Sequence, residues 1–153
     1  MKLTASKLNN FAMIKLPSAW MCGVRVNQIN DVKCTTTVRH RWMNQNPFNS
    51  MFWAVQGMAA ELSTGALVIG KIKESNHRIS MLVAQNKAVF TKKAKGKITF
   101  ECEQGVVVDN AIVKAISSGE GQTFWMQSTG KDSQGDVVSV FDFEWTIKLK
   151  SSL

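Results

Sequence analysis

Residues 46–70 have the sequence NPFNSMFWAVQGMAAELSTGALVIG, and from Asn49 to Gly70 this apolar and small-residue run contains one charged side chain, Glu61. A helix that is apolar nearly all round is typically enclosed by other elements, so we expect a long buried helix over about 51–69. Asn49 or Ser50 is expected to cap its first turn by accepting an amide hydrogen bond. Burying a carboxylate is costly. Glu61 therefore either has a partner that satisfies it or has a function.

The same run is long enough to suggest a membrane-spanning helix. Four polar residues lie near its centre, namely Gln56, Glu61, Ser63 and Thr64. An acid at that depth costs about 2.5 kcal/mol or more. The N-terminal segment contains Lys7 and Lys15 and lacks a long apolar core, so it does not resemble a signal peptide. We therefore expect a soluble, cytoplasmic protein with no membrane partner.

The composition is that of a globular chain. With 153 residues, 44% hydrophobic and 20% charged, the sequence predicts one domain over residues 1–153. The formal net charge of +8 suits nucleic acid, an anionic membrane or a phosphate-bearing ligand. The strands lack a stripe of aromatics between basic residues, so nucleic acid is not expected. The densest basic segment is TKKAKGK, residues 91–97, with Lys92, Lys93, Lys95 and Lys97. It is either a solvated turn or a phosphate site.

Cysteine and histidine are too sparse for a disulfide framework or a metal centre. Cys22, Cys34 and Cys102 include no C-x-x-C pair, so we expect free thiols in a reducing compartment. Two histidines without clustered acids make a metal site improbable, and we expect no metal and no cofactor.

The segments around the central run alternate between strand-like and helix-like patterns. We expect helices over 2–16, ended by Pro17, and over 106–117, with Asp109 as a possible cap. Strands are expected over 23–29, 32–42, 78–93, 96–104, 121–132 and 136–150, with turns at Asn30–Asp31 and 133–135. Residues 43–50 contain Pro47 and form a loop. About six hairpin-connected strands can curl around one apolar helix, which predicts an α+β fold.

This order of elements resembles the hot-dog fold, in which an antiparallel sheet wraps a long central helix. In the thioesterase branch related to phenylacetate degradation, the helix opens with Asn, two residues, Gly, two residues, His-Gly-Gly, six residues and an acid. Asn46 matches the Asn, and counting without a gap places Glu61 on the acid. Asn49 stands for the first Gly, and residues 52–54, Phe-Trp-Ala, stand for His-Gly-Gly. NPFNSMFWAVQGMAAELSTG, with PSAWMCGVRV (17–26) upstream, is more similar to a related hot-dog branch described as a domain of unknown function.

The resemblance implies an acyl thioester hydrolase, such as an acyl-CoA thioesterase, with the coenzyme A moiety as part of the substrate. Amides at the helix start would polarise the thioester carbonyl, and Glu61 would act as general base or nucleophile. Asn46 would hold the carbonyl or the water. The resemblance also implies a homodimer or a dimer of dimers, with amides and acid from different subunits. The implied substrate-binding residues are Asn49, Phe52, Trp53, Ala54, Gly57, Ser63 and Thr64.

Each of these assignments has a structural alternative. Candidate partners that would satisfy Glu61 are Arg39, His40, Arg41, Gln56 and Ser63. His40 itself is expected in the core. The aromatic residues Trp42, Phe48, Phe52 and Trp53 either belong to the core or an interface, or line an acyl pocket. Because His-Gly-Gly is replaced by bulky residues, a non-catalytic acyl or fatty-acid binding protein remains the alternative function.

Overall fold

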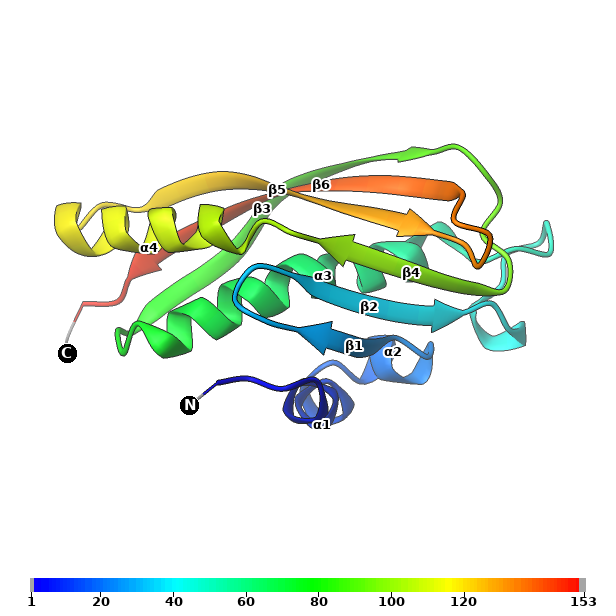
Figure 1. Cartoon of the computed structure of the whole chain (residues 1–153), viewed down its shortest axis with the longest axis horizontal. Coiled ribbons are helices and arrows are strands. Elements are labelled where there is room, and N and C mark those ends of the chain that lie inside the picture. The colour runs from blue at the N-terminus through cyan, green and yellow to red at the C-terminus, as the bar shows by residue number, and fades with distance from the viewer. Residues whose placement is uncertain (1, 152–153) are drawn as a thin grey trace.

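The computed structural model describes residues 2–151 (Figure 1). The N-terminal half contains α1 (Ala5–Lys15), α2 (Pro17–Met21), β1 (Arg25–Ile29), β2 (Cys34–Arg39), a 3-10 helix η1 (Trp42–Asn44) and α3 (Trp53–Glu74). The C-terminal half contains β3 (Ile79–Phe90), β4 (Lys97–Cys102), α4 (Gly105–Ser118), β5 (Gln122–Lys131) and β6 (Val137–Leu149).

The six strands form one antiparallel sheet with the order β1-β2-β4-β5-β6-β3. The sheet curls around α3, while α1 and α2 lie outside β1 and α4 lies beside β5 (Figure 1). This is the α+β hot-dog fold that the sequence predicts, with its long central helix. β3 is an edge strand, because it pairs with β6 on one side and with no described strand on the other.

Polar side chains on the buried face of α3 are paired with the sheet. Ser63 Oγ lies 2.7 Å from Ser128 Oγ on β5, and Ser139 on β6 donates to Gln56 Oε1 at 2.7 Å. Thr36 on β2 donates to the Ala59 carbonyl at 2.6 Å. These bonds satisfy groups that would otherwise be costly to bury. They explain how a helix with internal hydroxyl and amide groups remains inside the sheet.

The N-terminal helices are fixed to β1 and to each other. Thr4 caps α1, and Asn9 forms two hydrogen bonds, of 2.8 and 2.9 Å, with the backbone of Val26. Pro17 ends α1, as expected, and also begins α2. A proline suits the first turn of a helix because its missing N–H would have no intrahelical acceptor there.

The predicted bounds and caps of the central helix were wrong. α3 begins at Trp53 and ends at Glu74, five residues beyond the expected Ile69. Phe52 occupies the N-cap position and no side chain caps the helix. Asn49 instead lies at a positive φ of 58°, and the Ser50 hydroxyl bonds to Asn46. The loop uses its polar groups internally, so they are not free to cap.

Two other local predictions were also wrong. Asp109 lies inside α4, which begins at Gly105, and it pairs with Lys71 of α3 at 2.9 Å. The strand expected over 32–42 is limited to Cys34–Arg39 and is followed by η1. The turns are confirmed. Asn30 Oδ1 accepts from the amides of Val32 and Lys33, and Asp132 Oδ1 accepts from those of Gln134 and Asp136.

The three cysteines are free, as predicted. Cys34 and Cys102 lie directly opposite each other in the β2–β4 ladder. Burial raises the pKa of the Cys34 thiol to about 12 and that of Cys102 to about 11. Both thiols are therefore protonated and unreactive near neutral pH.

Candidate active site

Glu61 lies in the middle of α3, where its half-buried side chain faces a pocket of about 260 Å³. The junction of α1 and α2 forms one wall of this pocket, which is lined by Lys15, Leu16, Pro17, Ser18, Ala19, Met58, Glu61 and Leu62. Within residues 2–151, no side chain forms a hydrogen bond or ion pair with the carboxylate. Burial raises the pKa of Glu61 above its ordinary value. An acid with a raised pKa and an open cavity beside it is suited to proton transfer near neutral pH.

The groups expected to satisfy Glu61 bond elsewhere. Arg41 donates to the Met21 carbonyl, and Gln56 Oε1 accepts from Ser139. Ser63 donates to the Ala60 carbonyl at 2.7 Å. Arg39 is exposed at the end of β2, and the neighbouring His40 is half-buried with an unpaired Nε2. The alternative of a carboxylate neutralised by one of these residues finds no support in the described contacts.

The start of α3 presents free backbone amides. The Phe52 amide donates to the Asn44 carbonyl at 2.8 Å and is therefore occupied. The amides of Trp53 and Ala54 have no acceptor among the described residues. These groups lie at the positive end of the helix dipole. Of the three amides that the resemblance implies, two are available to a carbonyl oxygen.

Asn46 shapes the loop that leads into α3. Its Oδ1 accepts from the amides of Phe48 at 2.9 Å and Ser50 at 3.2 Å, and its Nδ2 donates to Ser50 Oγ at 3.0 Å. The Asn49 amide donates to the Asn46 carbonyl at 3.2 Å. Asn46 thus fixes the direction in which the chain enters α3. Contact of Asn46 with a substrate stays a prediction.

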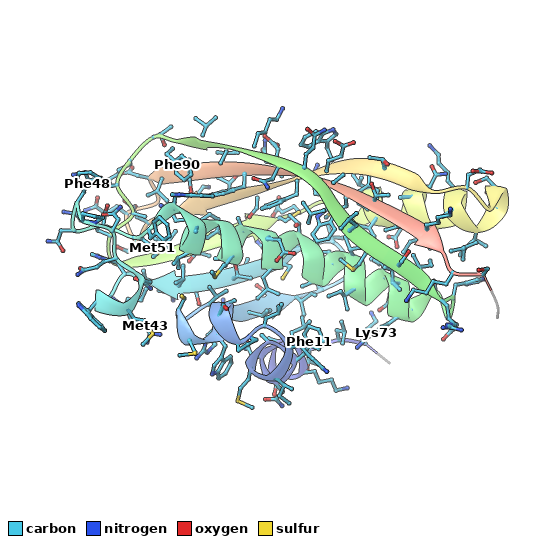
Figure 2. All side chains as sticks on the ribbon, turned by 180° about the vertical axis from the view of Figure 1, so that it is seen from behind. Phe11, Met43, Phe48, Met51, Lys73 and Phe90 are labelled. Atoms are coloured by element: carbon cyan, nitrogen blue, oxygen red, sulfur yellow. The ribbon has the colours of Figure 1, made fainter. Side chains whose placement is uncertain are left out.

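An aromatic pocket of about 550 Å³ opens beside this loop. Its walls include Phe48, Phe52, Trp53 and Phe90, and Phe48, Met51 and Phe90 lie together at this end of the molecule (Figure 2). Phe52 and Trp53 meet edge to face, with ring centroids 6.1 Å apart. Phe48 is 71% exposed and Trp53 is 56% exposed, so these rings are not core residues. An exposed aromatic wall of this size fits an apolar ligand.

The other predicted binding residues on α3 pack against the sheet. A Cβ at Gly57 would lie 3.4 Å from the Phe141 ring, so the small residue admits β6. Ser63 and Thr64 are fully buried, and Thr64 Oγ1 accepts from the Trp145 indole at 3.0 Å while donating to the Glu61 carbonyl at 2.9 Å. Thr64 and Trp145 thereby hold the turn of helix that bears Glu61. The part of Gly57, Ser63 and Thr64 in substrate binding stays a prediction.

Within one chain, Glu61 and the free amides do not meet. Glu61 follows Trp53 by eight residues, which places it about 12 Å further along the helix. Reacting groups must come within about 3–3.5 Å. Glu61 and Trp53 also line two different pockets. One copy of the chain therefore does not bring the Glu61 carboxylate and these amides to the same reacting group.

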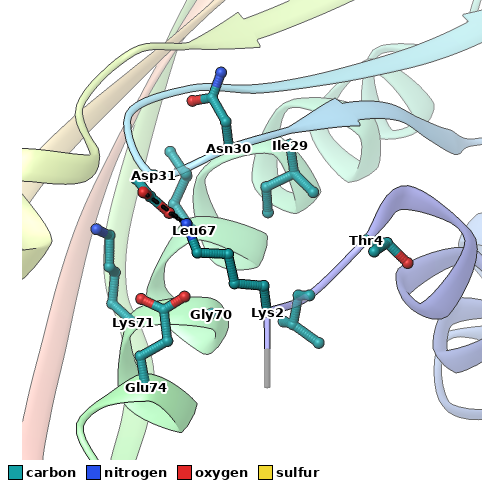
Figure 3. A pocket seen from close by; sticks show the side chains of 10 residues that line it. Lys2, Thr4, Ile29, Asn30, Asp31, Leu67, Gly70, Lys71 and Glu74 are labelled. Carbon is teal, nitrogen blue, oxygen red and sulfur yellow. Dashed lines mark hydrogen bonds and ion pairs between the residues drawn. The ribbon is translucent and has the colours of Figure 1, made fainter.

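A third pocket, of about 300 Å³, lies at the other end of α3 (Figure 3). Lys2 and Lys71 line it, but each has an acidic partner: Lys2 pairs with Asp31 at 3.0 Å and Lys71 with Asp109 at 2.9 Å. Its mixed charges and distance from Glu61 separate it from the candidate site.

The sequence patterns missed most of the wall around Glu61. Leu16 and Ala19 come from the N-terminal helices, about forty residues before Met58 and Leu62. No local signal pairs these segments. Lys93 and Phe90 of the aromatic pocket were likewise not linked to the start of α3. Met58 and Leu62 could have been placed beside Glu61, because they lie within one turn of it on the same helix.

The family model described as Domain of unknown function (DUF4442) matches residues 4–147. The chain belongs to this family. None of the curated proteins matches it. No helix within residues 2–151 is long and apolar enough to cross a membrane. The same part of the chain holds no group of three His, Cys, Asp or Glu residues that could bind a metal ion.

Solved structures share the whole architecture of this DUF4442 protein at low identity. PA5026 from Pseudomonas aeruginosa, a protein of unknown function and probable thioesterase, is 20% identical with a TM-score of 0.83, over 98% of this chain and 99% of that one. OLEI01261 from Chlorobaculum tepidum, of unknown function, is 15% identical with a TM-score of 0.82, over 97% and 99%. The thioesterase HI1161 from Haemophilus influenzae is 11% identical with a TM-score of 0.73, over 97% and 93%. At these identities the likeness establishes the hot-dog fold.

Proposed function

We propose that this DUF4442 protein hydrolyses an acyl thioester of the acyl-CoA class. The observation that carries the proposal is the Glu61 carboxylate, which is partly buried, has no partner among the described residues and faces a cavity. Several proteins of the same fold are thioesterases by name, which supports the reaction class.

In the proposed reaction, Glu61 acts as general base and takes a proton from water while the water oxygen attacks the thioester carbonyl carbon. Collapse of the tetrahedral intermediate breaks the C–S bond, and the leaving thiolate takes the proton back from the Glu61 carboxyl. The products are a carboxylic acid and a thiol. Direct attack by Glu61, followed by hydrolysis of the acyl-enzyme anhydride, gives the same products.

The carbonyl oxygen would be held by the Trp53 and Ala54 amides. Charge develops on this oxygen in the transition state, and free N–H groups at a helix start stabilise it without reorganisation. The neighbouring aromatic pocket is apolar and suits the acyl or pantetheine part of the substrate.

Because the two halves of the proposed site, Glu61 and the free amides, lie about 12 Å apart on one chain, the proposal requires a second copy. The β3 edge offers a surface for it. This strand is twelve residues long, has one charged residue, Lys87, and leaves Leu82 and Val89 exposed. A long strand edge with unpaired N–H and C=O groups is a template for pairing with another chain. Antiparallel pairing of two β3 strands would bring the two α3 helices side by side and complete two sites.

The first experiment measures thiol release from a panel of acyl-CoA substrates. Glu61→Gln keeps the size of the side chain and removes its basicity, so turnover should fall to background. Thr129→Ala, on the outer face of β5, serves as a matched surface control. A Glu61→Gln variant that hydrolyses the panel as fast as wild type would remove Glu61 from the mechanism.

A second experiment tests the assignment of the two halves to different subunits. Glu61→Gln lacks the acid, and Trp53→Pro lacks one free amide but keeps Glu61. Random mixing of two such dimers makes half of the dimers mixed, and each mixed dimer has one complete site of two. Mixing should therefore restore about a quarter of wild-type activity. A site contained in one chain would give no restoration.

The alternative function is saturable acyl binding without hydrolysis. The bulky Phe52 and Trp53 rings at the helix start favour it, because they narrow the approach to the amides. Binding of an acyl-CoA without release of free thiol by the wild-type protein would support this alternative, and turnover above background would exclude it.

A further inference from the structure

Five exposed cations gather where β2 ends, β3 turns into β4, and β5 ends. This cationic strip consists of Arg39, Lys93, Lys95, Lys97 and Lys131. None of the five forms an ion pair with any residue in the described part of the chain. Neighbouring lysines are neutralised: Lys92 pairs with Asp132 at 2.6 Å and Asp136 at 2.8 Å, and Lys33 pairs with Glu101 and Glu103.

The strip contains a like-charge pair within the sheet. Arg39 and Lys97 lie directly opposite each other in the β2–β4 ladder, so both side chains leave the same face. Directly opposed like charges destabilise a sheet. Lys131 adjoins them, because it is the cross-strand partner of Thr99, two residues after Lys97. An anion bound between these groups would relieve the repulsion.

The strip is connected to the aromatic pocket by the backbone. Lys93 lines that pocket, with its Nζ 5.9 Å from the Phe48 ring centroid. Ala94 accepts a hydrogen bond from the Met51 amide at 2.9 Å, and Gly96 accepts one from the His40 amide at 2.8 Å. Lys97 follows Lys93 by four positions, a span of at most about 14 Å. A ligand can therefore extend from the aromatic wall to the strip.

A groove on the sheet surface adjoins the strip and has a mixed lining. It holds about 420 Å³ on the outer face of β4 and β5, and it is lined by Glu101, Glu103, Gln127 and Thr129 together with Lys131 of the strip. Both acids of this groove have Lys33 as a partner. The unpaired positive charge is therefore concentrated on the strip, whose five cations have no acidic partner among the described residues.

We propose that the cationic strip binds the phosphate groups at the nucleotide end of the thioester carrier while the acyl end occupies the aromatic pocket. The proposal rests on the proposed function, because it names the carrier as a nucleoside phosphate of the coenzyme A class. Arg39 and Lys97 provide the central contacts, and Lys93, Lys95 and Lys131 surround them. Charge-assisted contacts of this kind are among the stronger hydrogen bonds in proteins.

The direct test measures binding of adenosine 3′,5′-bisphosphate by calorimetry, which needs no hydrolysis. The Arg39→Ala/Lys97→Ala double variant should bind the probe at least about tenfold more weakly than wild type. The control is Lys114→Ala/Lys148→Ala, which removes two exposed lysines from α4 and β6 and should leave binding unchanged. Equal affinity in wild type and the strip variant overturns the proposal.

Kinetics provide the second readout. The strip variant should lose about tenfold in kcat/KM on an acyl-CoA and nothing on the corresponding acyl-pantetheine, which lacks the nucleotide. Equal losses on both substrates overturn the phosphate role. If wild type binds the bisphosphate more tightly than the strip variant does but hydrolyses no thioester, the phosphate site is supported and the proposed function is rejected. Tighter strip-dependent binding of single-stranded DNA than of the bisphosphate at physiological salt would overturn the carrier in favour of nucleic acid.

Discussion

Replacing Trp53 by proline tests the free amide at the start of α3 with little change to the fold. Phe52 has φ −61° and ψ 134°, the extended conformation that a residue before proline prefers. Trp53 is the first residue of the helix, where proline is favoured, and its N–H has no acceptor among the described residues. Trp53→Pro therefore removes a donor without breaking a hydrogen bond. Trp53→Ala is the matched control, because it removes the same ring and keeps the amide.

The expected difference between the two variants follows from the role of that amide. An N–H that stabilises an oxyanion contributes about 2.7–4 kcal/mol, or 10²–10³ in kcat. Loss of the ring affects both variants equally and cancels in the comparison. Proline at a compatible position also changes the free energy of unfolding by less than about 1 kcal/mol. Trp53→Pro should thus fold like Trp53→Ala and turn over at least about a hundredfold more slowly.

The assay is steady-state thiol release from the best acyl-CoA, with thermal unfolding of both variants recorded first. Similar melting temperatures of the two variants establish that a difference in kcat comes from the missing amide and not from a loss of folded protein. If the two folded variants have kcat values within about twofold of each other, the Trp53 amide does not hold the oxyanion, and the assignment of the helix start as the carbonyl site is refuted.

Three further predictions concern stability and assembly. Burial raises the folded-state pKa of Glu61 above its value in the unfolded chain, so the folded protein binds the proton more tightly and its stability falls as pH rises through the folded pKa. In urea unfolding, Glu61→Gln should therefore be more stable than wild type at pH 8, and this gain in stability should vanish at pH 4. A gain of the same size at both pH values would contradict the raised pKa. Trp145→Phe leaves the buried Thr64 hydroxyl without its 3.0 Å donor and should cost about 2–3 kcal/mol, and an equal cost in a Thr64→Val background would show that the bond contributes nothing. Leu82→Lys should shift sedimentation toward monomer, whereas Val113→Lys on α4, at 65% exposure against 66% for Leu82, should not; a dimer that persists in Leu82→Lys would exclude the β3 edge.

Local sequence patterns sufficed for most of the fold. The alternation through Phe141, Phe143 and Trp145 identifies β6, and all three face the core as an alternating strand requires. The apolar run around Glu61 likewise identifies a helix that the sheet encloses. In both cases the signal depends on neighbours within a few residues, where periodicity is informative.

The start of α3 could not be predicted because its hydrogen bonds are tertiary. The Met51 amide bonds to the Ala94 carbonyl and the Phe52 amide to the Asn44 carbonyl, so these two amides have acceptors other than a capping side chain. Asn46 and Ser50 then bond to each other. Asn and Ser are favoured at an N-cap, but here the carbonyls of Ala94 and Asn44 accept from the Met51 and Phe52 amides in place of a capping side chain.

The replacement of His-Gly-Gly by Phe52, Trp53 and Ala54 changes the two parts of the site differently. The proposed oxyanion donors are backbone groups, so any residue other than proline that can begin a helix retains them. The proposed acid is a side chain, so it is present only because position 61, which aligns with the acid of the thioesterase branch, is a glutamate. The bulky residues instead change the lining of the aromatic pocket. The Phe52 and Trp53 rings are 45% and 56% exposed and line this pocket, and they form no hydrogen bond with the free amides. Under the proposed function, the substitution restricts which acyl group reaches the donors. Phe52→Ala should then broaden the range of accepted acyl chains while leaving kcat on the best substrate within about threefold. A large loss of kcat on every substrate would instead make the Phe52 ring part of the catalytic apparatus.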